Sequence, residues 1–115
     1  MKRRAAKPID LTLERDIQRD VVELYEGLGC TVIRFSQGKR LGSGTRQTPG
    51  IPDLRIYCPR LHRGWWHETK TPTGRQSAAQ IVFQALVEGC DESYVLGGTE
   101  AAIDYTRTIG LLAHG

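Results

Sequence analysis

The apolar residues of the first quarter of the chain follow the period of a helix. Within residues 13–28 they recur every three or four positions, at Ile17, Val21, Leu24 and Leu28, which predicts a helix with one buried stripe. The same spacing, continued one step towards the N-terminus, reaches Glu14, so this carboxylate is expected on the core-facing side. Glycines at positions 27 and 29 are expected to end the helix.

The middle of the chain has the patterns of strands. Residues 31–35 are rich in β-branched side chains, which favour strands. Residues 53–57 and 66–70 alternate between apolar and polar positions, and the proline, glycine and polar residues of 59–64 separate them. These two alternating segments are therefore predicted to form an antiparallel hairpin.

The last third of the chain predicts a helix, a short strand and a second helix. Ser77 followed by Gln80 has the spacing of a capping box. The helix that it starts is expected to continue to Glu88, with a core face made of Ala79, Val82, Phe83 and Leu86. Residues 93–96 predict a strand, and residues 100–109 predict the final helix. The fold class is therefore α/β, with the order αβββαβα and a mixed sheet flanked by helices.

The composition is that of an ordinary soluble protein. The 115 residues are 39% hydrophobic and 25% charged, which predicts one domain over residues 11–115 after a flexible basic tail at residues 1–10. No membrane-spanning run or signal-peptide core is found in the sequence, so a cytoplasmic location is expected. Three cysteines without a C-x-x-C pattern argue against a disulfide framework and against a structural zinc site.

The predicted hairpin carries the candidate chemistry. Side chains alternate between the faces of a strand, so Glu68 and Lys70 are expected on one face, with Asp53 beside Glu68 across the ladder. Two such carboxylates can hold Mg²⁺ or Mn²⁺, and the backbone carbonyl of Thr69 can add a further oxygen. Lys70 can orient a water molecule or stabilise developing negative charge. The alternative is a solvated hairpin face in which these charges only form salt bridges.

A longer ordered pattern carries a resemblance to a known family. Gly50-Ile-Pro-Asp53 is followed after fourteen residues by Glu68-Thr-Lys70, and then by Gly74-Arg-Gln-Ser77-Ala-Ala-Gln80. This set resembles the VRR-NUC family of the PD-(D/E)xK nuclease superfamily, over about residues 12–110. The resemblance implies a restriction-endonuclease-like core and a metal-dependent nuclease in which Asp53, Glu68 and Lys70 are catalytic.

The resemblance also implies roles for residues outside the hairpin. It places Glu14 in the metal site, Gln80 beside the active site, and Arg34 at a phosphate of the nucleic acid. For Glu14, the alternative is a first-turn carboxylate that only complements the helix dipole. For Arg34 the alternative is an ordinary surface arginine, and capping alone could explain Ser77 and Gln80.

The distribution of basic residues favours an anionic partner. A net charge of +3 is a mild indication by itself. The glycine-rich segment 37–48 gives a second indication of an anionic partner. Its backbone amides and the basic side chains of Lys39, Arg40 and Arg46 can contact a nucleic-acid backbone. The alternative is that this segment is a surface loop without a partner.

Several functions remain open from the sequence. The leading hypothesis is a structure-specific DNA endonuclease that acts as a homodimeric Holliday-junction resolvase, because two symmetric nicks need two sites. The pairs Trp65–Trp66 and Leu111–Leu112 could contribute to its interface. For the tryptophans the alternative is a monomer in which one lies in the core and the other at the edge of the strand. The other hypotheses are a flap- or nick-processing nuclease, a catalytically inactive nucleic-acid-binding module, and a small interaction protein.

Overall fold

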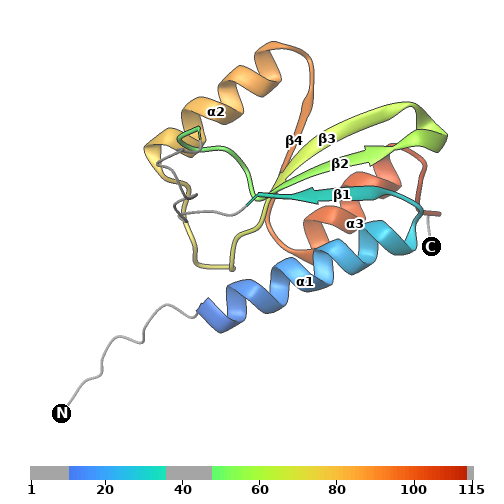
Figure 1. The fold of residues 1–115 in the computed structure, drawn as a ribbon, viewed down its shortest axis with the longest axis horizontal. Helices are drawn as coiled ribbons and strands as arrows, with labels where there is room; N and C mark the ends of the chain where they lie inside the picture. Colours follow the sequence, from blue (N-terminus) through green and yellow to red (C-terminus); the bar gives the residue numbers. More distant parts are fainter. Residues whose placement is uncertain (1–10, 36–47, 114–115) are drawn as a thin grey trace, which may run out of the picture.

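The computed structural model describes residues 11–35 and 48–113, in which one four-stranded sheet lies between helices (Figure 1). In chain order the elements are α1 (Leu11–Gly27), β1 (Thr31–Arg34), β2 (Leu54–Cys58), β3 (Arg63–Glu68), α2 (Ala78–Gly89), β4 (Ser93–Leu96) and α3 (Thr99–Thr108). A short 3-10 turn, Pro59–Leu61, connects β2 to β3. The predicted order αβββαβα is confirmed.

The sheet is mixed, as predicted, and its topology brings distant segments to one edge. The strand order is β1-β2-β3-β4, with antiparallel pairing between the first three strands and parallel pairing of β3 with β4. A parallel pair needs a crossover connection, which α2 provides. Consequently β1, β3 and β4 end, and β2 begins, at the same edge of the sheet.

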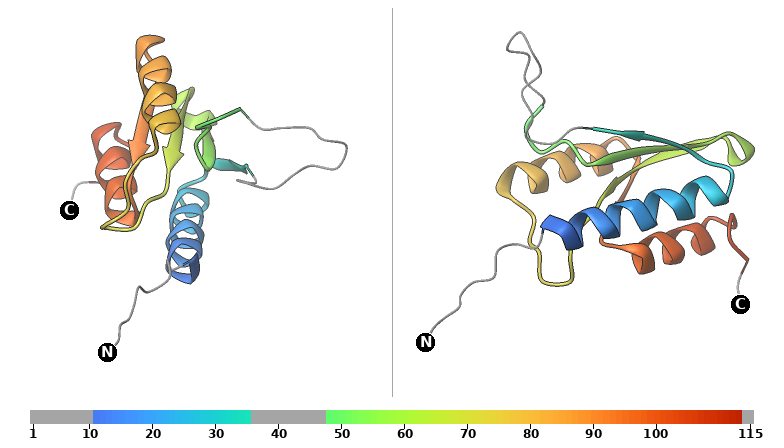
Figure 2. Two further views of the ribbon diagram at one scale, coloured as in Figure 1. Left: turned by 90° about the vertical axis from the view of Figure 1, so that its left-hand side faces the viewer. Right: turned by 60° about the horizontal axis from the view of Figure 1, so that its bottom comes forward.

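The helices form a layer on each face of the sheet. Helices α1 and α3 pack side by side against one face, and α2 lies over the other face near β4 (Figures 1 and 2). Alternation along the strands separates the two faces, and the main core forms under α1 and α3 from Val21, Val22, Tyr25, Leu54, Ile56, Trp65, Val95 and Ala102. The α1 stripe predicted from the sequence thus faces the sheet.

The proposed interface residues are largely core residues, so that part of the sequence interpretation was wrong. Trp65 is completely buried, in edge-to-face contact with Tyr25. Trp66 faces the other side of the sheet, between Phe35 and Phe83. Leu111 belongs to the main core as well. Burial of these large apolar groups stabilises one chain, which is the monomer-core alternative.

The buried face of α2 also differs from the prediction. Phe83 contacts Trp66 and Val87 is buried, whereas Val82 and Leu86, predicted to face the core, are 69% and 61% exposed. The reason is visible in the sequence of α2, where six of the seven residues from Ile81 to Val87 are apolar and form a wide arc around the helix. Periodicity cannot select one face of such a helix, so the position of the sheet decides it.

A buried polar chain ties the end of β3 to the end of β4. Gly97 can only accept through its carbonyl, so His67 donates from Nε2 at 2.9 Å and its Nδ1 accepts from the Tyr25 hydroxyl at 2.6 Å. Burial lowers the pKa of His67 to about 4, which keeps the ring neutral. The neutral His67 therefore fixes the strand that carries Glu68.

None of the helices within residues 11–35 and 48–113 has the length and apolar character required to cross a membrane.

Candidate active site

Three of the residues singled out in the sequence meet at one edge of the sheet. Asp53 directly precedes β2, Glu68 is the last residue of β3, and Lys70 follows it by two positions. Asp53 and Glu68 are almost completely buried. The Lys70 Nζ lies 3.8 Å from the Glu68 Oε2. The fold therefore gathers two carboxylates and one ammonium group from segments that are fifteen to seventeen residues apart.

Asp53 is fixed by bonds to the opposite strand. The Thr69 amide donates to Asp53 Oδ2 at 3.0 Å, and the Thr69 hydroxyl donates to the same oxygen. The Asp53 amide in turn donates to Glu68 Oε1 at 3.2 Å. Sequence reasoning considered only the carbonyl of Thr69 and missed its side chain, whose role here depends on a cross-strand contact. The Asp53 oxygen that these bonds leave open is Oδ1.

Gln80 links the start of α2 to Glu68. Its Nε2 donates to Glu68 Oε2 at 2.9 Å, while its Oε1 accepts from the Ser77 amide at 2.8 Å. The Ser77 hydroxyl completes the capping box by accepting from the Gln80 amide at 3.1 Å. One side chain thus caps a helix and orients a buried carboxylate, so the two readings of this pattern are compatible.

The carboxylate pair is electrostatically unsatisfied. The pKa of Glu68 rises from 4.5 to about 8, mainly because of burial and then because of the negative charge of Asp53. The Lys70 ammonium and the Asp53 amide oppose this rise only in part. Two oxygen-donor groups in one buried place, with too little positive charge beside them, fit a hard divalent cation.

The negative charge of Glu14 affects the Asp53–Glu68 pair electrostatically. Glu14 is half-buried on the first turn of α1, and its negative charge contributes to raising the pKa of Glu68. Within residues 11–35 and 48–113, however, no three histidine, cysteine or acidic side chains form a group able to hold a metal ion. The structure therefore joins Asp53 and Glu68 and does not place Glu14 in one ligand set with them.

The raised pKa of Glu68 predicts how stability depends on pH. Above pH 4.5 the unfolded chain loses this proton while the folded chain keeps it, so the contribution of Glu68 to the free energy of unfolding of the metal-free protein should fall as the pH rises from about 4.5 to about 8. The lowered pKa of His67 has the opposite effect between about 4 and 6.5, so the fall is expected without this opposition above pH 6.5. Glu68→Gln should remove this decrease, because the amide does not titrate. Urea unfolding in EDTA across this range measures it, and an unchanged slope in the variant would contradict the assignment.

The conformation and close contacts of residue 50 explain why it is a glycine. Its φ of +77° is favourable for glycine, and a Cβ there would lie 2.2 Å from the carbonyl oxygen of Ala79. The loop before Asp53 is thus packed directly against the first turn of α2, next to Gln80. The sequence identified Gly50 only as part of a motif. It could not predict the contact with Ala79, because the two residues are almost thirty positions apart in the chain.

Arg34 lies at the same edge of the sheet, on the β1 side. It lines an open groove of about 440 Å³ with residues of α1, namely Arg15, Asp16, Gln18 and Arg19. Arg19 is paired with Asp16 and Asp20 at 3.3 and 3.2 Å, whereas Arg15 and Arg34 form no ion pair with a described residue. Two guanidinium groups in one groove, neither of them paired with a described residue, suit contacts with phosphates.

We expect the double variant Arg15→Ala/Arg34→Ala to bind DNA more weakly at low salt. The slope of log affinity against log salt should decrease by about 0.9 for each phosphate contact that is lost. Arg63→Ala is the matched control, because Arg63 is an exposed arginine at the opposite end of the β2–β3 hairpin. A titration by fluorescence anisotropy at several salt concentrations measures the slope, and equal slopes in all three proteins would exclude the groove from binding.

The remaining predicted nucleic-acid contacts, Lys39, Arg40 and Arg46, lie outside the residues that the structure describes, as does the basic tail at residues 1–10.

Comparison with known proteins supports the fold. A solved structure described as a VRR_NUC domain aligns with a TM-score of 0.62 and 22% sequence identity, covering 83% of this chain and 94% of that one. No family model matches the sequence, and no curated protein matches it. The chain therefore has the fold of a VRR_NUC domain, which the resemblance in its sequence predicted.

Proposed function

We propose that this chain, which has the fold of a VRR_NUC domain, is a metal-dependent nuclease that hydrolyses phosphodiester bonds in DNA. The observation that carries the proposal is the Asp53–Glu68 pair, buried together and bordered by the Lys70 ammonium group. Buried like charges are costly. A site that buries two carboxyl groups together, with a raised pKa on one, is typical of a functional centre.

The residues at this edge have distinct roles in the proposed reaction. Asp53 and Glu68 would hold Mg²⁺ or Mn²⁺, with the Thr69 carbonyl and Glu14 as further predicted ligands. When bound, such an ion lowers the pKa of a coordinated water and stabilises negative charge on the phosphate. Lys70, 3.8 Å from the Glu68 carboxylate, would orient the attacking water or stabilise the same charge.

The supporting bonds position these groups. Thr69 holds Asp53 by two hydrogen bonds, and Gln80 holds Glu68 from the capped end of α2. Such secondary contacts fix the orientation of ligating carboxylates and are generally needed for metal affinity. Ser77 contributes indirectly, because its bonds fix the Gln80 side chain.

The proposal is tested with a panel of labelled linear, nicked, flapped and four-way DNAs, and matching RNAs, in Mg²⁺, Mn²⁺ or EDTA. We expect cleavage of DNA in the two metals and none in EDTA. Salt-sensitive binding without cleavage would instead favour the inactive binding module. Neither binding nor cleavage would favour the small interaction protein.

Within this function we propose a homodimer that acts on four-way junctions. Two identical sites related by a two-fold axis match the two symmetric nicks that a junction requires. The exposed apolar side chains of α2 support a self-association surface there, since Ile81, Val82 and Leu86 are all more than half exposed. This surface replaces the Trp65 and Leu111 positions suggested by the sequence.

Sedimentation at micromolar concentration tests the dimer. A 12.8 kDa species would contradict it, and Val82→Glu should convert a dimer to monomers if α2 is the interface. Faster cleavage of a flap or a nicked duplex than of a four-way junction would favour the alternative, a flap- or nick-processing nuclease.

A further inference from the structure

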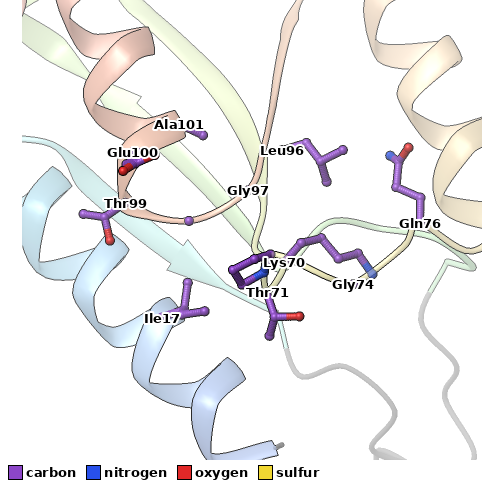
Figure 3. A pocket seen from close by; sticks show the side chains of 12 residues that line it. Ile17, Lys70, Thr71, Gly74, Gln76, Leu96, Gly97, Thr99, Glu100 and Ala101 are labelled. Carbon is purple, nitrogen blue, oxygen red and sulfur yellow. The ribbon is translucent and has the colours of Figure 1, made fainter. Parts of the chain in front are cut away.

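A cavity of about 590 Å³ lies beside the proposed catalytic residues (Figure 3). It is open to solvent and is lined by the turn after β3, the end of β4, the start of α3 and Ile17 of α1. Figure 3 shows the Lys70 side chain running along it from the end of β3 towards Gly74. Its volume is within the roughly 300–1,000 Å³ typical of sites for small ligands.

The position of the cavity follows from the strand order. Arg34 ends β1, Asp53 precedes β2, Glu68 ends β3, and the cavity opens at the end of β4. Neighbouring strands are about 4.8 Å apart, which is comparable to the roughly 3.4 Å between successive nucleotides of one stacked DNA strand. A DNA strand that crosses this edge with one phosphate at the carboxylates therefore has an adjacent nucleotide at the cavity.

The walls of the cavity suit a flat neutral ring. Four of its lining residues are apolar, namely Ile17, Pro72, Leu96 and Ala101. The Thr71 and Thr99 hydroxyl groups and the Glu100 carboxylate add hydrogen-bonding groups at its margin. A base removed from its stack is usually held in this way, between apolar side chains and by bonds to its edge.

The charges at the cavity disfavour an anion. Among the described residues that line it, Lys70 is the only basic one, and its ammonium group is already paired with Glu68. Glu100 places a negative charge in the first turn of α3. A phosphate would meet this carboxylate, whereas the amino group of a base can donate to it.

We infer that this cavity binds one unpaired nucleobase of the DNA, next to the phosphate that is cut. The inference rests on the proposed nuclease function and deepens it, because it names the feature of the substrate that the site selects. A paired base cannot enter the cavity without leaving its partner. The protein should therefore prefer DNA with an unpaired nucleotide, as at a branch point or bulge, over a continuous duplex.

Binding of two matched probes tests the inference. One is a duplex with a single bulged 2-aminopurine, and the other is the same duplex with that base paired, both measured in EDTA so that no cleavage occurs. The wild type should bind the bulged probe about tenfold more tightly, the size expected for one stacked base. The fluorescence of the bulged base should also change on binding.

Two variants fill the cavity from different sides. Leu96→Trp adds a large side chain at the end of β4, and Thr71→Trp adds one in the turn after β3. Each variant should lose the preference for the bulged probe while it binds the paired probe as before. Thr108→Trp is the matched control, because Thr108 is an exposed threonine at the end of α3 and does not line the cavity. Far-ultraviolet circular dichroism and thermal melting verify that all three fold.

The possible results separate this inference from the proposed function. Equal affinity of the wild type for the two probes, or an equal loss for both probes in the two cavity variants, would overturn the inference. Cleavage is scored separately with Mg²⁺. An absence of cleavage on every substrate contradicts the nuclease proposal, while the binding measurement in EDTA still decides whether the cavity holds a base.

Discussion

Asp53→Asn is expected to reduce DNA cleavage by a factor on the order of 10³ while leaving the fold intact. The asparagine side chain has the same shape, and its carbonyl oxygen can accept both Thr69 donors in place of Oδ2. Its amide group then stands where the second carboxylate oxygen, Oδ1, would ligate a cation. The variant therefore removes one negative charge and one metal ligand with little change in packing.

The same substitution should raise the stability of the metal-free protein at pH 8. The charge of Asp53 is the second cause of the raised pKa of Glu68 after burial, so its removal relieves a like-charge repulsion in a buried site. Substitution of a functional residue typically lowers activity and raises stability, whereas substitution of a structural residue lowers stability. Adding Mg²⁺ should stabilise the wild type and have little effect on the variant.

Cleavage rate under single-turnover conditions and thermal melting in EDTA and in Mg²⁺ measure these effects. Asp104→Asn is the control, since Asp104 is an exposed aspartate of α3. Cleavage near the wild-type rate in Asp53→Asn would remove Asp53 from the mechanism. A loss of stability at pH 8 would show that its role is structural.

Gly50→Ala is expected to have the second-largest effect, although Gly50 touches no substrate. The new methyl group would lie 2.2 Å from the Ala79 carbonyl oxygen and 2.9 Å from the Gln80 amide nitrogen, in a backbone conformation that alanine disfavours. The contacted atoms are backbone atoms of α2, so the loop or the helix start must move. Backbone strain and overpacking together should cost about 2–4 kcal/mol.

Activity should fall further than stability explains. A displaced α2 moves Gln80, which holds Glu68 at 2.9 Å, and a misplacement of about 1 Å can cost roughly 10²-fold in rate. Gly89→Ala is the matched control, because a Cβ there has no heavy atom within 4 Å. Urea unfolding and cleavage at a fixed folded fraction measure both effects, and a variant with wild-type stability and rate would show that the loop and α2 are not coupled.

The sequence alone was sufficient to predict the secondary structure. Apolar spacing predicted α1, alternation and turn residues predicted the β2–β3 hairpin, and the capping box predicted the start of α2. These signals are local, since they depend on hydrogen bonds and packing between residues a few positions apart. The ordered acidic and lysine pattern added the expected nuclease fold, which the structural comparison supports.

Tertiary structure alone decided how these pieces meet. It selected the Phe83 face of α2 over the Val82 face and placed Trp65 in the core. It also brought Gln80 to Glu68, Gly50 to Ala79 and Lys70 to a cavity at the start of α3. Each of these outcomes depends on contacts between segments far apart in the chain, where burial and backbone geometry, not local pattern, determine which atoms are neighbours.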